Sequence, residues 1–445
     1  GAVTAPQGFS ASGVFCDIKR IGTGKGSNKG QKPDLALILS DAEATVAGMF
    51  TTNQVAAAPV KLCVERVARG TTRAIVINSG NANACTGKTG LKDAFAMADH
   101  TAHCLKLQPE EVLVASTGRI GVTLPMPNLR NGITDAAARL GNTPEHADQA
   151  AEAILTSDTR RKQISIEFQL DGKTVRIGGM CKGAGMIQPG MSATGERPMA
   201  LPSAGLHATM LCFVTTDARI GTRALQTALR SSVAQSFNRI TVDGDMSTND
   251  TVLVLANGRA GNKPVTRAGA GSKAPASRVR DAQQFQAALD HVCLALAKMI
   301  VRDGEGVSRF VTVRVSGART LADADAAARA VANSALVKTS WYGGDPNWGR
   351  IIDALGYSAA LVHEDKVDIG YSSPGSKKVI YSLKRGQPTK TSFKTLCEQV
   401  AGPEFELHIH LNLGTAEALM YSCDLTEEYV DFNKGDVSDP ASLGG

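Results

Sequence analysis

The chain has 445 residues, of which 43% are apolar and 20% are charged, a composition that excludes general disorder and fits two large lobes or one large multilayer domain. The net charge is only +6, and the basic residues stand in short runs such as 160–162 and 377–378, which we interpret as solvent-exposed surface rather than as a nucleic-acid-binding arm. Glycine supplies 45 residues and aromatic residues only 4%, which favours tight turns around a small ligand over a stacking surface for single-stranded nucleic acid.

Strands and helices alternate along the whole chain. Apolar runs predict strands over 35–39, 74–77, 112–114, 210–214, 251–255 and 310–315, and a hairpin of 164–168 with 175–177 around Asp171-Gly172. Helical patterns cover 91–105, 144–155 (capped by Thr143), 222–236, 285–299 and 322–338. Residues 189–207 and 257–278 predict loops. The alternation predicts an α/β or α+β class with mixed sheets.

Metal, disulfide and membrane signals are weak in this sequence. The nine cysteines are scattered without a C-x-x-C pair, and His408 and His410 fit the solvent face of a strand better than a metal site. No apolar run approaches membrane-spanning length, so we expect a soluble intracellular protein with neither a membrane nor a nucleic-acid partner. We expect the cytoplasm or the mitochondrial matrix. The first residue is not Met, which is compatible with a removed leader.

One pair of residues, Ala208-Thr209, stands between an irregular loop and a buried strand. A threonine hydroxyl needs a base before it becomes a strong nucleophile. If the peptide bond before Thr209 is cut, the new α-amino group supplies that base, because its ordinary pKa is about 7.7 to 8. Without the cut, Thr209 is an ordinary strand threonine, and the residues alone leave both interpretations open.

Several separated motifs resemble one family. They cover residues 78–87, 116–118, 182–186, 208–218 (ATMLCFVTTDA), 236–251 (SFNRITVDGDMSTNDT), 303–306 and 345–351 (DPNWGRI). In these motifs, and from Gly8 to about Ser438, the chain resembles the ornithine acetyltransferase (glutamate N-acetyltransferase) family of arginine biosynthesis. The resemblance implies a layered α/β/β/α sandwich with a smaller C-terminal lobe, and it implies no metal and no organic cofactor.

The resemblance also implies a self-cleaving enzyme. Cleavage between Ala208 and Thr209 gives an α chain, 1–208, and a β chain, 209–445, which assemble as an α₂β₂ heterotetramer or a larger complex. Thr209 then takes the acetyl group of N-acetylornithine as an ester and passes it to glutamate in a ping-pong acyltransferase reaction. Some members of the family also accept acetyl-CoA as the donor.

The family's site residues carry over to matching positions of this sequence. Thr117 and Gly118 match the oxyanion hole, which stabilises the charge that develops on the acetyl oxygen. The substrate-binding positions match Thr156, Lys182, Thr209, Glu305, Asn433 and Ser438. The chemistry of two of them is clear: the Lys182 ammonium suits a substrate carboxylate, and the Glu305 carboxylate suits a substrate ammonium group.

The segment between Lys182 and Thr209 departs from the family because it is longer and contains a second Ala-Thr pair, 193–194. We predict Thr209 as the nucleophile because the residues after it match the family, whereas those after Thr194 do not. Two alternatives stay open. One is an amidohydrolase or aminopeptidase that uses the same threonine and passes the acyl group to water. The other is an uncleaved, inactive binding relative, which the long loop before Thr209 favours.

Overall fold

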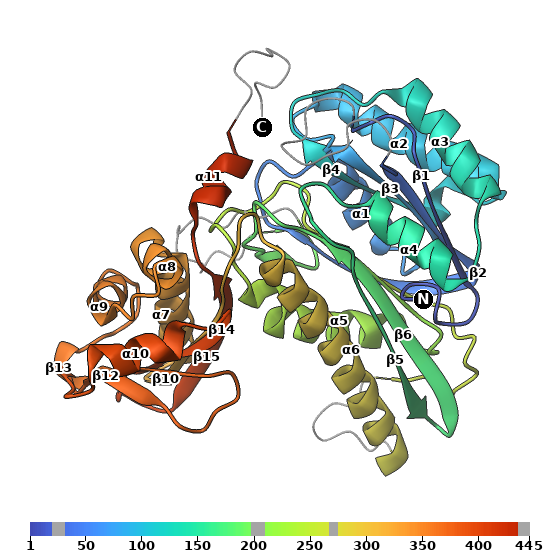
Figure 1. Ribbon diagram of the computed structural model, residues 1–445. Coiled ribbons are helices and arrows are strands. Elements are labelled where there is room, and N and C mark those ends of the chain that lie inside the picture. Colours follow the sequence, from blue (N-terminus) through green and yellow to red (C-terminus); the bar gives the residue numbers. More distant parts are fainter. Residues whose placement is uncertain (20–31, 197–209, 267–274, 435–445) are drawn as a thin grey trace.

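The computed structural model describes residues 1–19, 32–196, 210–266 and 275–434, and these residues form two lobes (Figure 1). The larger lobe is built on a nine-stranded sheet, and the smaller C-terminal lobe on a six-stranded sheet. Both lobes contain helices as well as strands. The predicted mixed α/β fold with a smaller C-terminal lobe is therefore confirmed.

The nine-stranded sheet has the strand order β4-β3-β2-β9-β8-β6-β5, with β1 and β7 also paired to β2. Its strands are β1 Phe9–Val14, β2 Leu35–Thr51, β3 Thr71–Asn81, β4 Val112–Arg119, β5 Lys162–Leu170, β6 Lys173–Lys182, β7 Met191–Ser192, β8 Leu211–Thr216 and β9 Thr251–Ala256. Each strand predicted for this lobe lies within, or within one residue of, one of these. The helices of the lobe are α1 Ala58–Val67, α2 Gly87–Leu105, α3 Met126–Ala138, α4 Pro144–Ala153, α5 Thr222–Gln235 and α6 Ala276–Arg302, with the short 3₁₀ helices η1 Pro109–Glu111 and η2 Phe237–Arg239.

Strands β8 and β9 separate two hydrophobic cores, because successive side chains of a strand lie on opposite faces. Leu211 and Phe213 join the first core, with α1–α4 and β1–β4, whereas Cys212 and Val214 join the second core, with α5 and α6. The long strand β2 connects two parts of the sheet: its first half pairs with β1 and β3, and its second half pairs with β9. The helices and the sheet are therefore layered, as the resemblance implied.

The β5–β6 hairpin forms where the sequence predicted it. Leu170 pairs with Lys173, so the connection is the two residues Asp171 and Gly172, with φ angles of 51° and 71°. Positive φ at both positions is the conformation that Asp-Gly accepts readily and that matches the twist of antiparallel strands.

The C-terminal lobe has the strand order β13-β12-β11-β14-β10-β15. Its strands are β10 Phe310–Ala318, β11 Asp368–Ser372, β12 Ile380–Lys384, β13 Gln387–Pro388, β14 Glu404–His410 and β15 Ala416–Cys423. Its helices are α7 Leu321–Asn333, α8 Ala335–Tyr342, α9 Trp348–Gly356, α10 Phe393–Val400 and α11 Glu427–Phe432, with η3 Glu364–Lys366. In β14, Leu407 and Ile409 are buried, and His408 and His410 lie on the other face, as the alternation predicted.

Three predictions need correction. The single helix predicted over 322–338 is two helices, because the Ser334 hydroxyl accepts the N–H of Val337 and starts α8 there. Thr143 precedes α4, but its hydroxyl contacts His146 Nδ1 at 2.8 Å instead of capping the backbone. The loop predicted over 257–278 ends earlier, since α6 begins at Ala276. Parts of both predicted loops, 197–207 and 267–274, lie outside the described residues.

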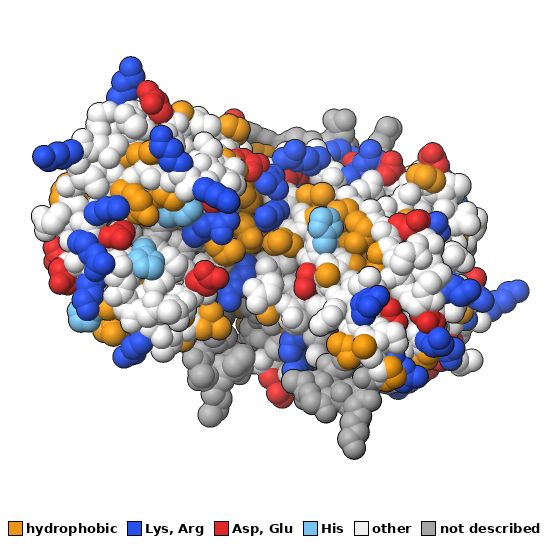
Figure 2. Space-filling model, turned by 90° about the horizontal axis from the view of Figure 1, so that it is seen from below, with side chains coloured by type: hydrophobic (Ala, Val, Ile, Leu, Met, Phe, Trp, Pro, Cys, Tyr) orange, Lys and Arg blue, Asp and Glu red, His pale blue; other side chains and the backbone are white. Residues whose placement is uncertain are grey.

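The surface carries charges of both signs. Figure 2 shows acidic and basic side chains intermixed across one face, with hydrophobic side chains gathered near its middle. In the described parts of the chain, no helix is both long and apolar enough to span a membrane. The compartment stays a prediction.

Candidate active site

Strand β8 begins beside the end of β6, and this register brings distant parts of the sequence together. Leu211 pairs with Lys182 of β6 on one side and with Thr251 of β9 on the other. The N–H of Met210 donates to Asp250 Oδ1 at 2.7 Å. Ala208 and Thr209 lie outside the described residues. The described chain therefore resumes one residue after the predicted nucleophile, next to the predicted substrate lysine.

Thr117 and Gly118 stand near the end of β4, where Gly118 pairs with Gly80 of β3. Gly118 has a φ of 130°, and a Cβ at this position would lie 2.3 Å from the backbone carbonyl carbon of Gly80. Only glycine allows the two backbones to approach this closely. A cavity of about 180 Å³ borders this turn and is lined in part by Gly80, Asn81 and Arg119.

Buried amides fix this turn to the segment that enters β9. Asn249 Nδ2 donates to the carbonyl oxygens of Ala82 and Ser116, at 2.7 and 2.8 Å. The Ser116 hydroxyl donates to Asn78 Oδ1 at 2.6 Å. These partners come from three separate motifs of the sequence, and their contacts explain why small polar residues are dense in each of them.

Lys182 lies fully inside the protein, at the end of β6. Its Nζ donates to Thr117 Oγ1 at 3.3 Å and lies 3.9 Å from Asp158 Oδ2. Burial lowers the pKa of the Lys182 ammonium group below its ordinary value, and the Asp158 carboxylate opposes that shift. Two residues predicted for different roles, oxyanion hole and substrate binding, are thus in direct contact.

Thr156 follows α4 and is half-buried. Its N–H donates to Asp158 Oδ2 at 3.0 Å, and Asp158 Oδ1 accepts the N–H of Gly183 at 2.7 Å. Asp158 therefore joins the Thr156 loop to the end of β6, so that Thr156 belongs to the same group as Thr117 and Lys182.

The basic run 160–162 is only partly a surface feature. Arg160 and Arg161 are exposed, but the prediction is wrong for Lys162, which is buried between the carboxylates of Asp158 and Asp303. Burial acts to lower the pKa of Lys162, yet the two carboxylates outweigh it and raise the pKa. Burial likewise acts to raise the pKa of Asp158, and the neighbouring ammonium groups hold it below the usual range. Sequence reasoning missed this role because the only signal was a basic run.

Glu305 and Asn433 form a second group close to the first. The N–H of Glu305 donates to the carbonyl of Ala184 at 2.9 Å, and Asn433 Nδ2 donates to Glu305 Oε2 at 3.0 Å. A Cβ on Gly185 would lie 2.4 Å from Glu305 Oε2, so the carboxylate packs against this glycine. Segment 182–185 joins the two groups. Ser438 lies outside the described residues.

The second Ala-Thr pair lies in a different setting. Thr194 is exposed, and its hydroxyl accepts the N–H of Glu196 at 3.3 Å, the contact of an ordinary turn. All nine cysteines lie among the described residues and none forms a disulfide.

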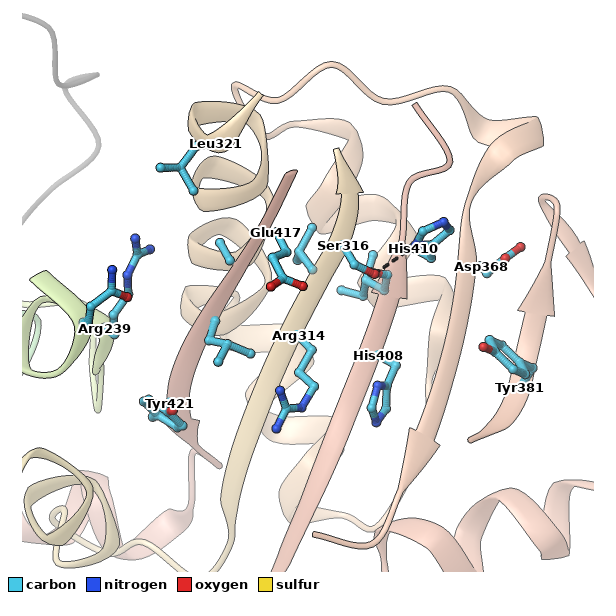
Figure 3. Close-up of a pocket in the computed structure, with 15 residues that line it drawn as sticks. Arg239, Arg314, Ser316, Leu321, Asp368, Tyr381, His408, His410, Glu417 and Tyr421 are labelled. Carbon is cyan, nitrogen blue, oxygen red and sulfur yellow. Dashed lines mark hydrogen bonds between the residues drawn. The ribbon is translucent and has the colours of Figure 1, made fainter. Parts of the chain in front are cut away.

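A cavity of about 670 Å³ lies elsewhere, mainly on the uncovered face of the six-stranded sheet (Figure 3). Some of its polar side chains already have partners: Arg314 pairs with Glu406, and His410 contacts the Ser316 hydroxyl at 2.9 Å. None of the predicted site residues lines it. We therefore place the candidate site around Lys182 and not here.

The family model and the curated relatives point to one family. The family model described as ArgJ family matches residues 13–435. The arginine biosynthesis bifunctional protein ArgJ of Symbiobacterium thermophilum is 45% identical over 433 residues, which cover 97% of this chain and 98% of the relative. The glutamate N-acetyltransferase of Methanocaldococcus jannaschii is 43% identical over 441 residues, covering 97% and 98%.

Among solved structures, the ornithine acetyltransferase of Mycobacterium tuberculosis in complex with ornithine is 37% identical, covers 43% of this chain and 95% of its own, and has a TM-score of 0.38. Since the family model spans nearly the whole chain and relatives above 40% identity cover almost all of it, the chain belongs to the ArgJ family.

Proposed function

We propose that this ArgJ-family acyltransferase of arginine biosynthesis moves an acetyl group from N-acetylornithine to glutamate, using Thr209 as its nucleophile after cleavage between Ala208 and Thr209. The names of the relatives support the reaction class. One observation in the structure carries the assignment of the site. The start of β8, one residue after Thr209, lies in register with Lys182, whose Nζ contacts Thr117.

In the first half-reaction, Thr209 Oγ1 attacks the acetyl carbonyl carbon and its proton passes to the Thr209 α-amino group. Thr117 and Gly118 stabilise the negative charge that develops on the acetyl oxygen. The C–N bond then breaks, the α-amino group returns the proton to the leaving nitrogen, and ornithine departs. The acetyl group is left as an ester of Thr209.

In the second half-reaction, the amine of glutamate attacks the ester carbon. The ester C–O bond breaks, the proton lost by the attacking amine reaches Thr209 Oγ1 through the α-amino group, and N-acetylglutamate leaves. Lys182 binds the carboxylate that both substrates carry beside the reacting nitrogen. Glu305, with Asn433, receives the side-chain ammonium of ornithine. The same site also accepts acetyl-CoA if this chain shares the property of some family members.

Cleavage gives two chains, 1–208 and 209–445, that share one sheet. Strand β8 of the second chain pairs with β6 of the first, and β9 pairs with β2. The products therefore stay together, and we propose that two such pairs assemble as α₂β₂.

The experiment that tests this proposal combines intact mass, a denaturing gel and an acetyl-exchange assay. We expect two fragments that meet at Ala208-Thr209, acetyl transfer from N-acetylornithine to labelled glutamate, and the loss of both in Thr209→Ala. Hydrolysis of N-acetylornithine without transfer to glutamate would show that the protein is an amidohydrolase and not a transferase. A single uncleaved and inactive species would support the binding relative instead. A native mass that matches one pair of chains would overturn the α₂β₂ assembly alone.

A further inference from the structure

Four buried charged groups meet behind the candidate site and carry an inference of their own. Lys162 Nζ donates to Asp158 Oδ1 at 2.5 Å and also contacts the Asp303 carboxylate. Lys182 Nζ lies 3.9 Å from the other oxygen of Asp158. All four side chains are at most 2% exposed. The two positive and two negative charges balance, which is the condition under which charges survive in a protein interior.

Asp158 is the carboxylate of this cluster that contacts the predicted substrate-binding residues. Its Oδ1 accepts the Lys162 ammonium and the N–H of Gly183, while its Oδ2 accepts the N–H of Thr156 and faces Lys182. The carboxylate thus touches the loop of one predicted substrate residue and lies beside the side chain of another. Asp303 instead contacts Lys162, Thr159 and Arg160.

Lys182 Nζ and Asp158 Oδ2 are separated by 3.9 Å. This separation is too long for a hydrogen bond but close enough for strong charge attraction. The Asp158 carboxylate therefore favours the charged form of Lys182 without accepting a hydrogen bond from its ammonium group. An ammonium group has three donors, and a bound carboxylate needs at least one of them.

We propose that Asp158 is a positioning residue: its carboxylate holds Lys182 as an ammonium group directed at Thr117 and holds the Thr156 loop beside it, ready for the substrate carboxylate. This inference rests on the proposed function, because it takes Lys182 as the group that binds the substrate.

The charges that act on Lys182 come from four directions. Asp158 follows α4, Lys162 begins β5 and Glu305 follows α6. Asp250 precedes β9, and burial raises its pKa and so weakens its negative charge; burial likewise raises the pKa of the adjoining Cys181 thiol, which is neutral. Removing the Asp158 carboxylate takes away the negative charge that lies 3.9 Å from Lys182 Nζ and opposes the effect of burial. Lys182 then loses its proton at a lower pH than in the wild type, and the affinity for a carboxylate substrate falls from that pH upward.

The test is the pH dependence of acetyl transfer in Asp158→Asn, measured between pH 6.5 and 9.5. We expect KM for N-acetylornithine to begin its rise at least about one pH unit lower than in the wild type, with KM then growing about tenfold per pH unit. At pH 6.5, kcat should stay within about threefold of the wild type, because the change affects binding. Asp303→Asn is the matched control: it removes a buried carboxylate from Lys162, and its KM profile should follow the wild type.

An unchanged KM profile in Asp158→Asn, or an equal shift in both variants, would overturn the inference and show a purely structural role. If Asp158→Asn does not fold, ¹⁵N NMR of the lysine side chains in the wild type decides, with the signal lost in Lys182→Arg as the assignment. A charged Lys182 at pH 7.5 is expected, and a neutral one would contradict the proposal. Absence of acetyl transfer in the wild type, by contrast, would refute the proposed function itself.

Discussion

Buried carboxylates of this protein differ in how fully the backbone satisfies them. Asp217 accepts the N–H of Arg176 with one oxygen and the N–H of Gln7 with the other, at 2.8 and 3.0 Å. Asp250 accepts the N–H of Met210 through Oδ1, and its buried Oδ2 has no hydrogen-bond partner among the described residues. Burial raises the pKa of Asp250 well above its usual range. The two residues therefore respond in opposite ways to the same substitution.

Asp250→Asn should stabilise the protein at neutral pH. The folded chain binds the Asp250 proton more tightly than the unfolded chain, whose pKa is about 3.9, so this contribution to stability is complete below about pH 4 and is lost as the pH rises. The side-chain amide of the variant does not titrate, so this loss of stability does not occur. Its oxygen still accepts the N–H of Met210. Thermal unfolding should show the advantage of the variant growing from pH 4.5 to 7.5.

The control for Asp250→Asn is Asp217→Asn. In this variant the side-chain NH₂ group replaces one of the two accepting oxygens, so that two donors face each other. This should lower the free energy of unfolding by about 1–3 kcal/mol at neutral pH. Equal stability changes in the two variants would contradict the distinction drawn between these carboxylates.

Gly185→Ala tests the second group of the candidate site. The new Cβ would lie 2.4 Å from Glu305 Oε2 and must displace that carboxylate. We expect KM for N-acetylornithine to rise at least about tenfold, since a charge-assisted contact is lost, with a smaller change in kcat. Gly356→Ala is the control, because a Cβ there meets nothing within 4 Å. The measurement is steady-state kinetics. An unchanged KM in Gly185→Ala would show that Glu305 does not take part in substrate binding.

Among the elements, the break between α7 and α8 shows how a single side chain sets a helix boundary. The hydroxyl of Ser334 accepts the N–H of Val337, three residues later, which is the contact of a helix N-cap. Thr143 occupies the same position before α4 but makes no such bond. A polar residue of the right type is thus necessary for a cap without being sufficient.

Ser334→Ala should lower the free energy of unfolding by about 1 kcal/mol, the usual worth of an N-cap. Thr143→Ala should lower it by less than half as much, because no cap is lost. Chemical denaturation of both variants gives the comparison. A larger effect at Thr143 would show that its contact with His146 outweighs the cap at Ser334.

The strands were predictable because each is a short run of apolar residues, and the β5–β6 turn because Asp-Gly favours positive φ. The break at Ser334 was not, since residues 321–342 contain neither Gly nor Pro. In the site, motif resemblance picked out Thr117, Lys182 and Glu305. The burial of Lys162 depends on Asp303, 141 residues away in sequence, and no local pattern predicts such a pairing.

Across the whole molecule, helix α11 extends from the C-terminal lobe toward the larger lobe (Figure 1). Thr426 is the N-cap of helix α11, and its hydroxyl donates to the Gly306 carbonyl at 2.7 Å. The Tyr429 hydroxyl donates to Asp243, the carboxylate that also accepts the N–H of Met186 and of Ile187. These contacts place Asn433 against Glu305, so both lobes contribute to the candidate site.

Asn433→Ala should therefore weaken substrate binding without destabilising either lobe, because Asn433 is exposed and contacts Glu305 through its side chain alone. We expect KM to rise about tenfold, the effect of one hydrogen bond to a charged group. Lys434→Ala is the matched neighbour, since Lys434 is exposed and pairs locally with Asp431. Equal KM values in the two variants would show that Asn433 does not take part in substrate binding.

The shared sheet also constrains how the protein is made. Strands β8 and β9 leave the ribosome after their partners β6 and β2, and until then those partners keep an open pairing edge. Residues 1–208 expressed alone would present both edges to neighbouring chains and aggregate. The proposed cut must therefore follow folding, and two separately synthesised halves would be a poor substitute for the single precursor.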